Sequence, residues 1–379
     1  MAQRVKTDWV LYWSILGMVC FGLVMVYSAS SVVARLRFGY SGYYIVRQFG
    51  WAILAVAVMM LLKRTDYRKL NTAGWAFAAL AVVIVLLVIV YFVDARSHRW
   101  LRIGPVGIQP SEFAKPALIL FLAYFVTLRA KAINNRYTLL PALITVGLLA
   151  VAVVLADLGT ALVLVISAAV VFYVAGLDSR YIRIAIAVGL VAVGIAVAAK
   201  PYRLVRVFGF FDPEYKTLDR FAWGNKVKEY MRRSEFNRDP GYHVRQSKIA
   251  VASGGVIGQG LMEGKQKLFY LPEAHTDFIY AVVGEELGLM GCVAVLAAFL
   301  VLLWRGLRLV RSTPDDFGRY LALGVTTMLV VQALMNMSVV LDLAPTKGIP
   351  LPLVSYGGSS LLSSMISLGM LLSVSEQSG

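Results

Sequence analysis

The segment Leu271-Pro272-Glu273-Ala274-His275-Thr276-Asp277 leads directly into a hydrophobic run that begins at Phe278. It places ionisable side chains at the mouth of an otherwise apolar stretch of chain. A carboxylate held where water meets lipid is energetically costly and usually functional. This junction indicates a membrane protein whose chemistry lies where its spans meet water.

The whole chain has the composition of a protein that crosses a membrane many times. Its 379 residues are 59% hydrophobic and 15% charged, and the mean hydropathy is +0.73. Apolar runs long enough to cross the roughly 30 Å hydrocarbon core cover residues 9–28, 45–62, 71–93, 110–128, 139–156, 160–177, 181–199, 279–304, 319–341 and 353–374. The predicted fold class is an all-α polytopic membrane protein with ten transmembrane helices in one domain, residues 1–379. The first run lacks a cleavage site, so we expect a retained helix rather than a signal peptide.

The formal net charge of +16 raises the question of nucleic acid binding. Lys and Arg cluster instead in the short loops beside the predicted spans, where they decide orientation. With the N-terminus inside, the inner segments carry about twice as many Lys and Arg residues as the outer ones. The sequence therefore predicts two cytoplasmic termini and no nucleic acid partner.

This orientation leaves one large extracytoplasmic loop, residues 200–276, between the seventh and eighth spans. A connection this long is usually functional. Its part from Asp212 to Asp239 is nearly balanced in charge, which favours a solvated or interfacial helix, with a partner docking surface as the alternative. The part from Tyr242 to Ala252 has the pattern of a short helix on the membrane surface.

Four glycines follow between positions 254 and 260, but no Gly-Lys-Ser/Thr comes after them, so a nucleotide-binding loop is rejected. They are expected to turn the backbone sharply near the lipid headgroups. Lys265 and Lys267 come next, and their spacing suits contact with an anionic lipid as well as it suits plain solvation.

Asp277 is expected at the N-terminal end of the eighth span, where the helix dipole favours the ionised carboxylate. A plain helix N-cap is an equally good interpretation of this position. Glu285 and Glu286 follow in the same run, about 12–14 Å deeper at 1.5 Å per residue. Buried acids of this kind need partners, either for folding or for a path through the bundle.

A second polar region, Arg96 to Glu112, leads into the fourth span. Glu112 and Lys115 are three residues apart and can pair on one helix face. A structural ion pair and a group that faces a substrate cavity both remain open. Asp157 lies in the turn between the fifth and sixth spans, where capping of the turn is at least as good an interpretation as ligand binding.

The last two spans are joined by residues 343–360, which contain too many Pro and Gly residues for a continuous helix. Irregular backbone at membrane depth is tolerated only where it is buried in protein or lines a watered cavity. Three outer segments could thus converge on one site, which suggests an enzyme or transporter for an amphiphilic, anionic substrate.

Several uncommon motifs occur in one order along nearly the whole chain, and they resemble the shape, elongation, division and sporulation (SEDS) family. The motifs are Pro272 to Phe278, Gly284 to Gly288, Met25 to Ser30, Arg99 to Leu101, Gln109 to Glu112, Asp157 to Thr160, Asn336 and Pro345 to Ser360. Within the family, the motifs at 273–275 and 345–348 are closer to the branch that serves cell division than to the branch that serves elongation.

The resemblance implies a peptidoglycan glycosyltransferase of the bacterial cytoplasmic (inner) membrane that polymerises lipid II on the outer face. It also implies a class B penicillin-binding transpeptidase as partner, together with regulatory membrane proteins of the divisome. The essential aspartate of the family falls on Asp277, which we expect to be the general base. Glycosidic bond formation requires deprotonation of an acceptor hydroxyl while a lipid pyrophosphate leaves, so a carboxylate and cationic groups are the minimum equipment.

The other site residues expected from the motifs are substrate-binding residues: Arg99, Trp100, Gln109, Glu112, Lys115, Asp157, Lys265, Lys267, His275, Lys347 and Ser355. Among them Arg99, Lys115 and Lys347 would hold the pyrophosphate or balance nearby acids. A divalent cation, Mg²⁺ or Mn²⁺, on the pyrophosphate fits this chemistry, but no full set of metal ligands is visible.

The sequence departs from the family pattern in three places. Ala156 replaces a common proline, Asp342 replaces a common glycine, and the loop from Glu214 to Asp239 is longer than usual. Three alternatives to a division polymerase remain: an elongation polymerase, a lipid II flippase that uses the buried charges as a path, and a scaffold without catalysis.

Overall fold

A computed structural model of the protein describes residues 7–94, 97–104, 106–198, 203–204, 207, 210, 242–345 and 348–377. The longer helices in these ranges are α1 (Trp9–Phe38), α2 (Tyr43–Arg64), α3 (Ala73–Val93), α4 (Pro110–Arg129), α5 (Arg136–Ala156), α6 (Leu158–Val174), α7 (Ser179–Ala198), α10 (Tyr242–Gly254), α11 (Ile279–Ser312), α12 (Asp316–Val340) and α13 (Gly358–Gln377). Two short 3-10 helices, η1 (Tyr67–Leu70) and η2 (Ala130–Ala132), and two strands, β1 (Leu101–Ile103) and β2 (Val106–Ile108), complete the described elements.

Every one of the ten predicted apolar runs corresponds to a helix. Within the described ranges, nine helices are long and apolar enough to cross a membrane, and α6, with 17 residues, is the shorter tenth. The predicted polytopic all-α fold is therefore confirmed. The short helix predicted for Tyr242 to Ala252 in the large loop is present as α10, while positions 211–241 lie outside the described residues.

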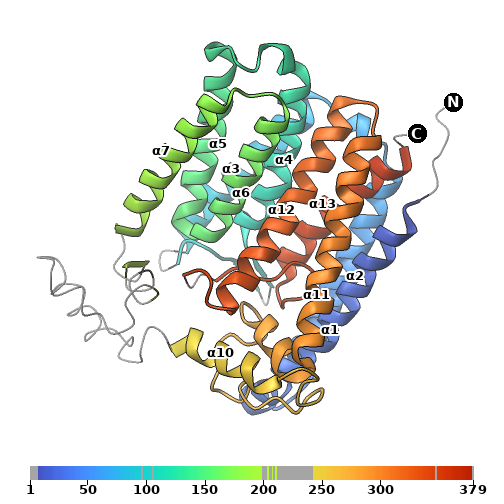
Figure 1. Ribbon diagram of the computed structural model, residues 1–379, viewed down its shortest axis with the longest axis vertical. Coiled ribbons are helices and arrows are strands. Elements are labelled where there is room, and N and C mark those ends of the chain that lie inside the picture. Colours follow the sequence, from blue (N-terminus) through green and yellow to red (C-terminus); the bar gives the residue numbers. More distant parts are fainter. Residues whose placement is uncertain are drawn as a thin grey trace, which may run out of the picture.

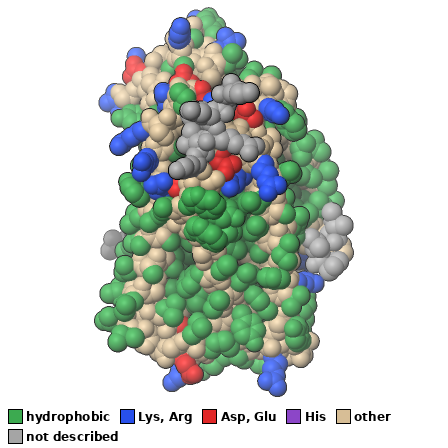
Figure 2. All heavy atoms as spheres, turned by 90° about the vertical axis from the view of Figure 1, so that its right-hand side faces the viewer, with side chains coloured by type: hydrophobic (Ala, Val, Ile, Leu, Met, Phe, Trp, Pro, Cys, Tyr) green, Lys and Arg blue, Asp and Glu red, His purple; other side chains and the backbone are tan. Residues whose placement is uncertain are grey.

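The two chain termini lie at the same end of the helix bundle, and α10 lies at the opposite end (Figure 1). These ends are called the terminal end and the α10 end below. On the face shown in Figure 2, charged side chains gather mainly at the terminal end, and a broad band of hydrophobic side chains covers the bundle beneath them. This distribution is that of a helix bundle with an apolar belt for lipid.

Local sequence signals set several helix ends. Asp8 caps the N-terminus of α1 by accepting a hydrogen bond from the backbone N–H of Leu11, and Gly39 ends the helix in the left-handed conformation with a φ of 74°. Asp315 caps α12 by accepting from the N–H of Gly318. Aspartate satisfies otherwise orphaned N–H groups, and glycine adopts positive φ without a Cβ penalty, so both ends follow from residue type.

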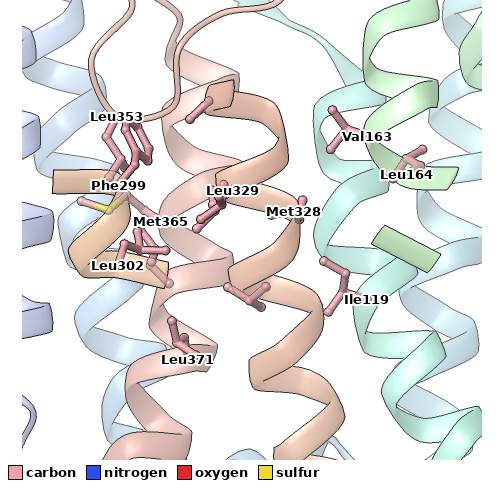
Figure 3. Close-up of a cluster of buried hydrophobic side chains, with 14 of the residues drawn as sticks. Ile119, Val163, Leu164, Phe299, Leu302, Met328, Leu329, Leu353, Met365 and Leu371 are labelled. Atoms are coloured by element: carbon pink, nitrogen blue, oxygen red, sulfur yellow. The ribbon is translucent and has the colours of Figure 1, made fainter. Parts of the chain in front are cut away.

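The core lies around α12, α13 and α4. In these helices 72%, 83% and 61% of the apolar stretch is buried, whereas none of α7 is. Side chains from α4, α6, α11, α12 and α13 interlock in this core, as Figure 3 shows for Ile119, Val163, Phe299, Met328 and Met365. The peripheral helices α3, α5 and α7 present mostly apolar surface outward, as expected for lipid contact.

Small residues let α13 approach its neighbours closely. This helix packs most extensively against α2, and a Cβ atom on Gly369 would stand 2.9 Å from the carbonyl oxygen of Met59 in α2. Most other small residues along α13 are buried serines. Without a hydrophobic driving force between helices in lipid, close packing of small residues is the usual means of association.

The helix α11 is not one straight rod. Gly288 interrupts it with a φ of 65° and a ψ of −160°, and the hydroxyl of Tyr280 donates to the carbonyl oxygen of Cys292, 3.1 Å away. In a straight helix these 12 residues would separate the two groups by about 18 Å along the axis. The first part, residues 279–287, therefore doubles back beside the start of the second part, residues 289–312; we call the first part the short helix.

This turn corrects the expected depth of Glu285 and Glu286. Both acids are buried, as predicted, and both have partners. They do not lie deeper in the bundle on a continuous helix, because the short helix turns back at Gly288 and its end meets residues 255–267 near α10.

Candidate functional site

A cavity of about 970 Å³ lies toward the α10 end of the bundle. Four parts of the chain form its wall: the first turns of α2, the region of the β1–β2 hairpin, the turn at 273–277 and residues 350–360. The predicted convergence of three distant segments is confirmed, and α2 adds a fourth. The volume falls within the roughly 300–1,000 Å³ range of small-molecule sites.

Asp277 is half-buried in this wall, in the turn that precedes α11. The N-cap position of α11 is Phe278. Of the two equally good interpretations of Asp277, a plain N-cap and a functional carboxylate, the N-cap is therefore wrong. Gly348 lies directly beside the carboxylate, because a Cβ atom at that position would stand 2.6 Å from Oδ2 of Asp277. Because glycine has no Cβ atom, residue 348 leaves room for the carboxylate of Asp277.

A buried asparagine ties the turn at Asp277 to the connection between α12 and α13. The Nδ2 atom of Asn336 donates to the carbonyl oxygens of Asp277 and Ile349, both at 2.7 Å. Asn336 is 2% exposed; its bond to Ile349 is buried and its bond to the half-buried Asp277 is partly buried. One residue of α12 therefore fixes the backbone on both sides of the carboxylate.

Ser355 makes a second tie between the same two segments. Its hydroxyl donates to the carbonyl oxygen of Thr276 at 2.6 Å and accepts from the backbone N–H of Leu351 at 2.9 Å. Gln48 of α2 donates to the carbonyl oxygen of Ser355 and accepts from the backbone N–H of Gly357. Ser355 does not line the cavity, so the structure gives it a supporting role in place of the predicted substrate contact.

Glu112 and Lys115 form a buried ion pair, with 2.7 Å between Oε2 and Nζ and 1% exposure for each residue. Lys115 also donates to Gln332 at 2.7 Å, and Gln332 donates in turn to the carbonyl oxygen of Pro350 in the cavity wall. Neither ion lines the cavity. Of the two open interpretations, the structure supports the ion pair, in which Lys115 balances a nearby acid.

Arg99 and Trp100 line the cavity beside the hairpin. Asp94 holds this turn by accepting the backbone N–H groups of both residues at 3.2 Å. The hydroxyl of Ser97 and these backbone groups hold the pKa of Asp94 below its usual range, since they stabilise the carboxylate. The loop is thus preorganised to present Arg99.

Asp157 contacts Arg99 from outside the cavity wall. Its carboxylate caps α6 through the N–H of Gly159 at 2.9 Å and the hydroxyl of Thr160 at 2.6 Å. An oxygen of the same carboxylate lies 3.9 Å from the guanidinium of Arg99. Asp157 does not line the cavity, so its observed role combines the predicted capping with electrostatic support of the arginine.

Gln109 lines the cavity and is held by serines on both sides. Its Nε2 atom donates to Ser111 at 2.9 Å, and its backbone N–H donates to the hydroxyl of Ser359 at 3.3 Å. The sequence placed Gln109 in the site, and the structure brings it there.

The sequence did not indicate the contribution of α2. Arg47 and Trp51 line the cavity, and the guanidinium of Arg47 lies 4.4 Å from the ring centre of Tyr43. Trp51 packs against Gly358, where a Cβ atom would come within 2.3 Å of the indole. A signal existed, because Arg47 is the single charged residue in the predicted run 45–62.

His275 lies in the cavity wall between two tyrosine rings, 4.6 Å from Tyr44 and 5.5 Å from Tyr356. Burial lowers the pKa of His275; Glu273 opposes this change and Arg37 adds to it. The imidazole is therefore neutral near pH 7 and can donate or accept one hydrogen bond. Burial also raises the pKa of the Tyr356 hydroxyl, which stays protonated.

The three other predicted lysines do not meet in the described part of the site. Lys267 is 4% exposed and pairs with Glu286 at 2.5 Å, so the structure gives it an internal ion pair in place of the predicted phosphate contact. Lys265 is exposed and lies outside the cavity wall. Lys347 lies outside the described residues.

Among the described residues, no group of three or more His, Cys, Asp or Glu side chains could hold a metal ion. The acids in the cavity wall are Glu273 and Asp277. Such a pair fits a cation shared with a substrate, because Mg²⁺ commonly uses one or two carboxylates together with phosphate oxygens. The divalent cation stays a prediction.

The cavity combines groups of both charges. Arg47 and Arg99 supply cations, Asp277 and Glu273 supply carboxylates, and aromatic rings lie between them. Fold and site together define a polytopic membrane protein with a charged cavity at one end of its bundle, suited to an amphiphilic molecule with an anionic head.

The chain belongs to the FtsW/RodA/SpoVE family of cell cycle proteins, whose sequence model matches residues 9–379. The family that the motifs indicated is thereby confirmed.

Individual relatives resemble the chain over nearly its whole length. A "Probable peptidoglycan glycosyltransferase FtsW" of Geobacter metallireducens is 39% identical, covering 98% of this chain and 95% of the relative. "Stage V sporulation protein E" of Bacillus subtilis is 36% identical, covering 99% of this chain and 99% of the relative.

Solved structures show the same architecture. A chain from a peptidoglycan synthase complex, studied for the coordination of polymerization and crosslinking, matches with a TM-score of 0.72 and 28% identity over 98% of both chains. The rod shape determining protein RodA of Thermus thermophilus matches with a TM-score of 0.65 and 26% identity, covering 98% of this chain and 97% of that one.

Proposed function

We propose that this protein is a peptidoglycan glycosyltransferase that polymerises lipid II into β-1,4-linked glycan strands and releases undecaprenyl diphosphate. The observation that carries the proposal is the half-buried carboxylate of Asp277 in a cavity that also contains Arg47 and Arg99. Relatives that cover almost the whole chain carry the name of this activity.

In the proposed reaction, the hydroxyl oxygen of the acceptor sugar attacks the anomeric carbon of the donor, and Asp277 accepts the proton of that hydroxyl. The bond between that carbon and the pyrophosphate oxygen breaks, and negative charge develops on the leaving group. Arg47 and Arg99 stabilise this charge by electrostatic attraction. Among the described residues, no acceptor lies within hydrogen-bond distance of the buried Nε atom of Arg99, so the guanidinium is not fully committed to protein partners.

A divalent cation bound to the pyrophosphate is part of the proposal. Glu273 and Asp277 are the described carboxylates that would hold it, and its chemistry would be charge neutralisation on the leaving group.

The cellular setting is proposed from the family and the charge pattern. A septal role, rather than elongation, is supported by the FtsW names of several relatives. Both termini lie in the cytoplasm and the cavity faces outward, since Lys and Arg are more frequent at the terminal end. A class B penicillin-binding transpeptidase is the proposed partner, supported by the similarity to a chain of a synthase complex. Divisome membrane proteins are the proposed regulators.

A lipid II flippase is not favoured by the buried charges. A flippase that moves an anionic headgroup through the bundle would need ionisable groups that face a continuous polar route. Glu112 pairs with Lys115, Glu286 pairs with Lys267, and Glu285 accepts backbone N–H groups. These acids are committed to internal partners at 0–1% exposure.

The proposal is tested by polymerisation of purified lipid II by the reconstituted protein, with a partner transpeptidase whose crosslinking serine is disabled. Asp277→Asn keeps the size of the side chain but removes the base, and we expect a loss of about 10²–10⁴-fold in rate. Asp316→Asn, on the exposed surface at the terminal end, is the matched control. Equal rates for wild type and Asp277→Asn would exclude Asp277 as the general base. The absence of polymer from every variant, wild type included, would favour a flippase or a scaffold.

A further inference from the structure

A buried cluster of three side chains lies at the far end of the short helix, away from the cavity wall. The carboxylate of Glu286 lies 2.5 Å from the Nζ atom of Lys267 and 2.6 and 2.7 Å from the hydroxyl oxygen of Ser28. Lys267 also donates to Ser28 at 3.0 Å. The three residues are at most 4% exposed and come from α11, the loop after α10 and α1.

The neighbouring acid holds the same loop through its backbone. Glu285, 1% exposed, accepts the backbone N–H groups of Lys265 at 2.7 Å and Gln266 at 3.0 Å. Two adjacent carboxylates therefore bind one loop segment, one by an ion pair and one by main-chain hydrogen bonds. The loop leads within ten residues to Asp277.

The glycine-rich segment after α10 closes the turn at Gly288. Four backbone hydrogen bonds replace those that the turn interrupts: Gln259 N–H to Glu285, Gly260 N–H to Glu286, Leu289 N–H to Gly255 and Met290 N–H to Val256, at 2.9–3.2 Å. Contact is close, since a Cβ atom on Gly258 would stand 2.2 Å from the carbonyl oxygen of Glu286. Glycine is required here for proximity as well as for positive φ.

These contacts fix one end of a helical segment whose other end leads to Asp277. The short helix is about 13 Å long at 1.5 Å per residue. Its far end is held by an ion pair, a hydroxyl and main-chain bonds, so its first turn has a defined place. Asn336 holds the backbone of Asp277 at the near end.

We propose that Ser28, Lys267 and Glu286 form a positioning cluster for Asp277: they fix the short helix and thereby hold the carboxylate at its place in the cavity. The inference rests on the proposed role of Asp277 as the base. It also gives a function to the Met25 to Ser30 motif, which the cavity does not use. Removal of one ion alone would leave an uncompensated buried charge, so the test removes both.

The first test measures the place of residue 277 without measuring catalysis. Asp277→Cys is introduced with and without Lys267→Met and Glu286→Met, and the rate of labelling by a polar thiol reagent is followed at position 277 by mass spectrometry. A released short helix should raise this rate about fivefold, because a segment without its anchors opens to solvent more often. The matched control removes the Lys63–Glu376 pair, 2.9 Å long and at the terminal end, and should leave the rate unchanged.

The second test keeps Asp277 and measures polymerisation. The folded variant with Lys267→Met and Glu286→Met should lose about tenfold or more in kcat with KM for lipid II changed less than about twofold, because position and not ground-state binding is lost. A merely structural role would lower Tm and leave the kcat of the folded protein intact.

Ser28→Ala keeps both charges and serves as the milder variant, with an expected rise of about twofold in labelling. Unchanged labelling in the folded double variant overturns the proposal. If that variant does not fold, unchanged labelling in Ser28→Ala overturns it. The labelling result does not depend on glycan synthesis, so it separates failure of this inference from failure of the proposed function.

Discussion

Substitution of Gly348 by alanine should slow the proposed polymerisation strongly without unfolding the protein. The new Cβ atom would stand 2.6 Å from Oδ2 and 3.5 Å from Cγ of Asp277. The φ angle of Gly348 lies outside the left-handed region, so the backbone itself accepts alanine. The effect is therefore a local collision with the carboxylate.

The size of the effect follows from this distance. Close carbon–oxygen contacts are normally about 3.3–3.6 Å, so the backbone at 348 or the carboxylate must move by about 0.7–1.0 Å. A misplacement of this size can cost about 100-fold in rate. We expect kcat for glycan polymerisation to fall about 10–100-fold while Tm changes by only a few degrees.

The assay is the rate of polymer formation from lipid II, together with thermal unfolding in the same detergent or lipid. Gly147→Ala in α5, where a new Cβ atom meets nothing within 4 Å, is the matched control and should keep full activity. Full activity of Gly348→Ala would refute the reasoning, since it would show that the carboxylate can leave its observed position at no cost to catalysis.

Three further perturbations probe the supports of the cavity. Asn336→Ala leaves the buried carbonyl group of Ile349 and the partly buried one of Asp277 without their donor. The free energy of unfolding should fall by about 1–3 kcal/mol in total, measured by chemical or thermal unfolding. An unchanged Tm would contradict this. Lys115→Met leaves Glu112 buried and uncompensated, at a cost of about 3–5 kcal/mol, and Glu112→Gln in the same chain should restore part of the Tm if the ion pair is the cause. Because burial and Arg37 lower the pKa of His275 below the ordinary 6.5, the unfolded state binds the proton more tightly. Stability is then fully present above about pH 6.5 and falls as pH decreases; Tm from pH 8 to 5 should drop less in His275→Gln than in wild type, and identical profiles would exclude this residue as the source.

The spans and the convergence of polar segments could be predicted because they depend on local properties. A run of apolar residues such as 319–341 has to cross lipid wherever it lies in the bundle. The Pro and Gly residues of 343–360 exclude a helix at membrane depth, which requires buried or watered surroundings. The predicted start of the last span at 353 was early, since α13 begins at Gly358 after this irregular stretch.

The partners of the buried charges could not be predicted, because they are far apart in the sequence. Ser28 and Glu286 are 258 positions apart, and Lys267 had an equally good solvated interpretation. The ion pair of Glu112 and Lys115 could be predicted only because the two residues are three positions apart and share one helix face. The role of Arg47 likewise depended on the placement of α2.

The turn at Gly288 was hidden for a different reason. Apart from Glu285 and Glu286, the run from Phe278 to Leu303 carries no charged residue, so its hydropathy predicts one helix and not a reversal. The backbone angles of Gly288, the hydrogen bond from Tyr280 to Cys292 and the contacts of Gly288 with the backbone at Val256 and Gly258 reveal it.

The departure at Asp342 has a local explanation. This residue adopts a φ of 58°, a conformation that glycine adopts freely and that Asp adopts more readily than most residues. Its carboxylate also pairs with Lys248 of α10 at 3.0 Å. The exposed pair is worth at most about 1 kcal/mol, so Asp342 is tolerated at this turn rather than required by it.

The reversal at Gly288 also bears on how the chain enters the membrane during synthesis. Residues 289–312 carry no acid, and their three arginines, Arg305, Arg308 and Arg311, lie near the terminal end. This segment is about 36 Å long at 1.5 Å per residue, enough to insert as an ordinary hydrophobic helix. Ser28 and Lys267 precede Glu286 in the chain. Both partners are therefore already synthesised when Glu286 leaves the ribosome, and they can pair with the acid as soon as the three segments come together.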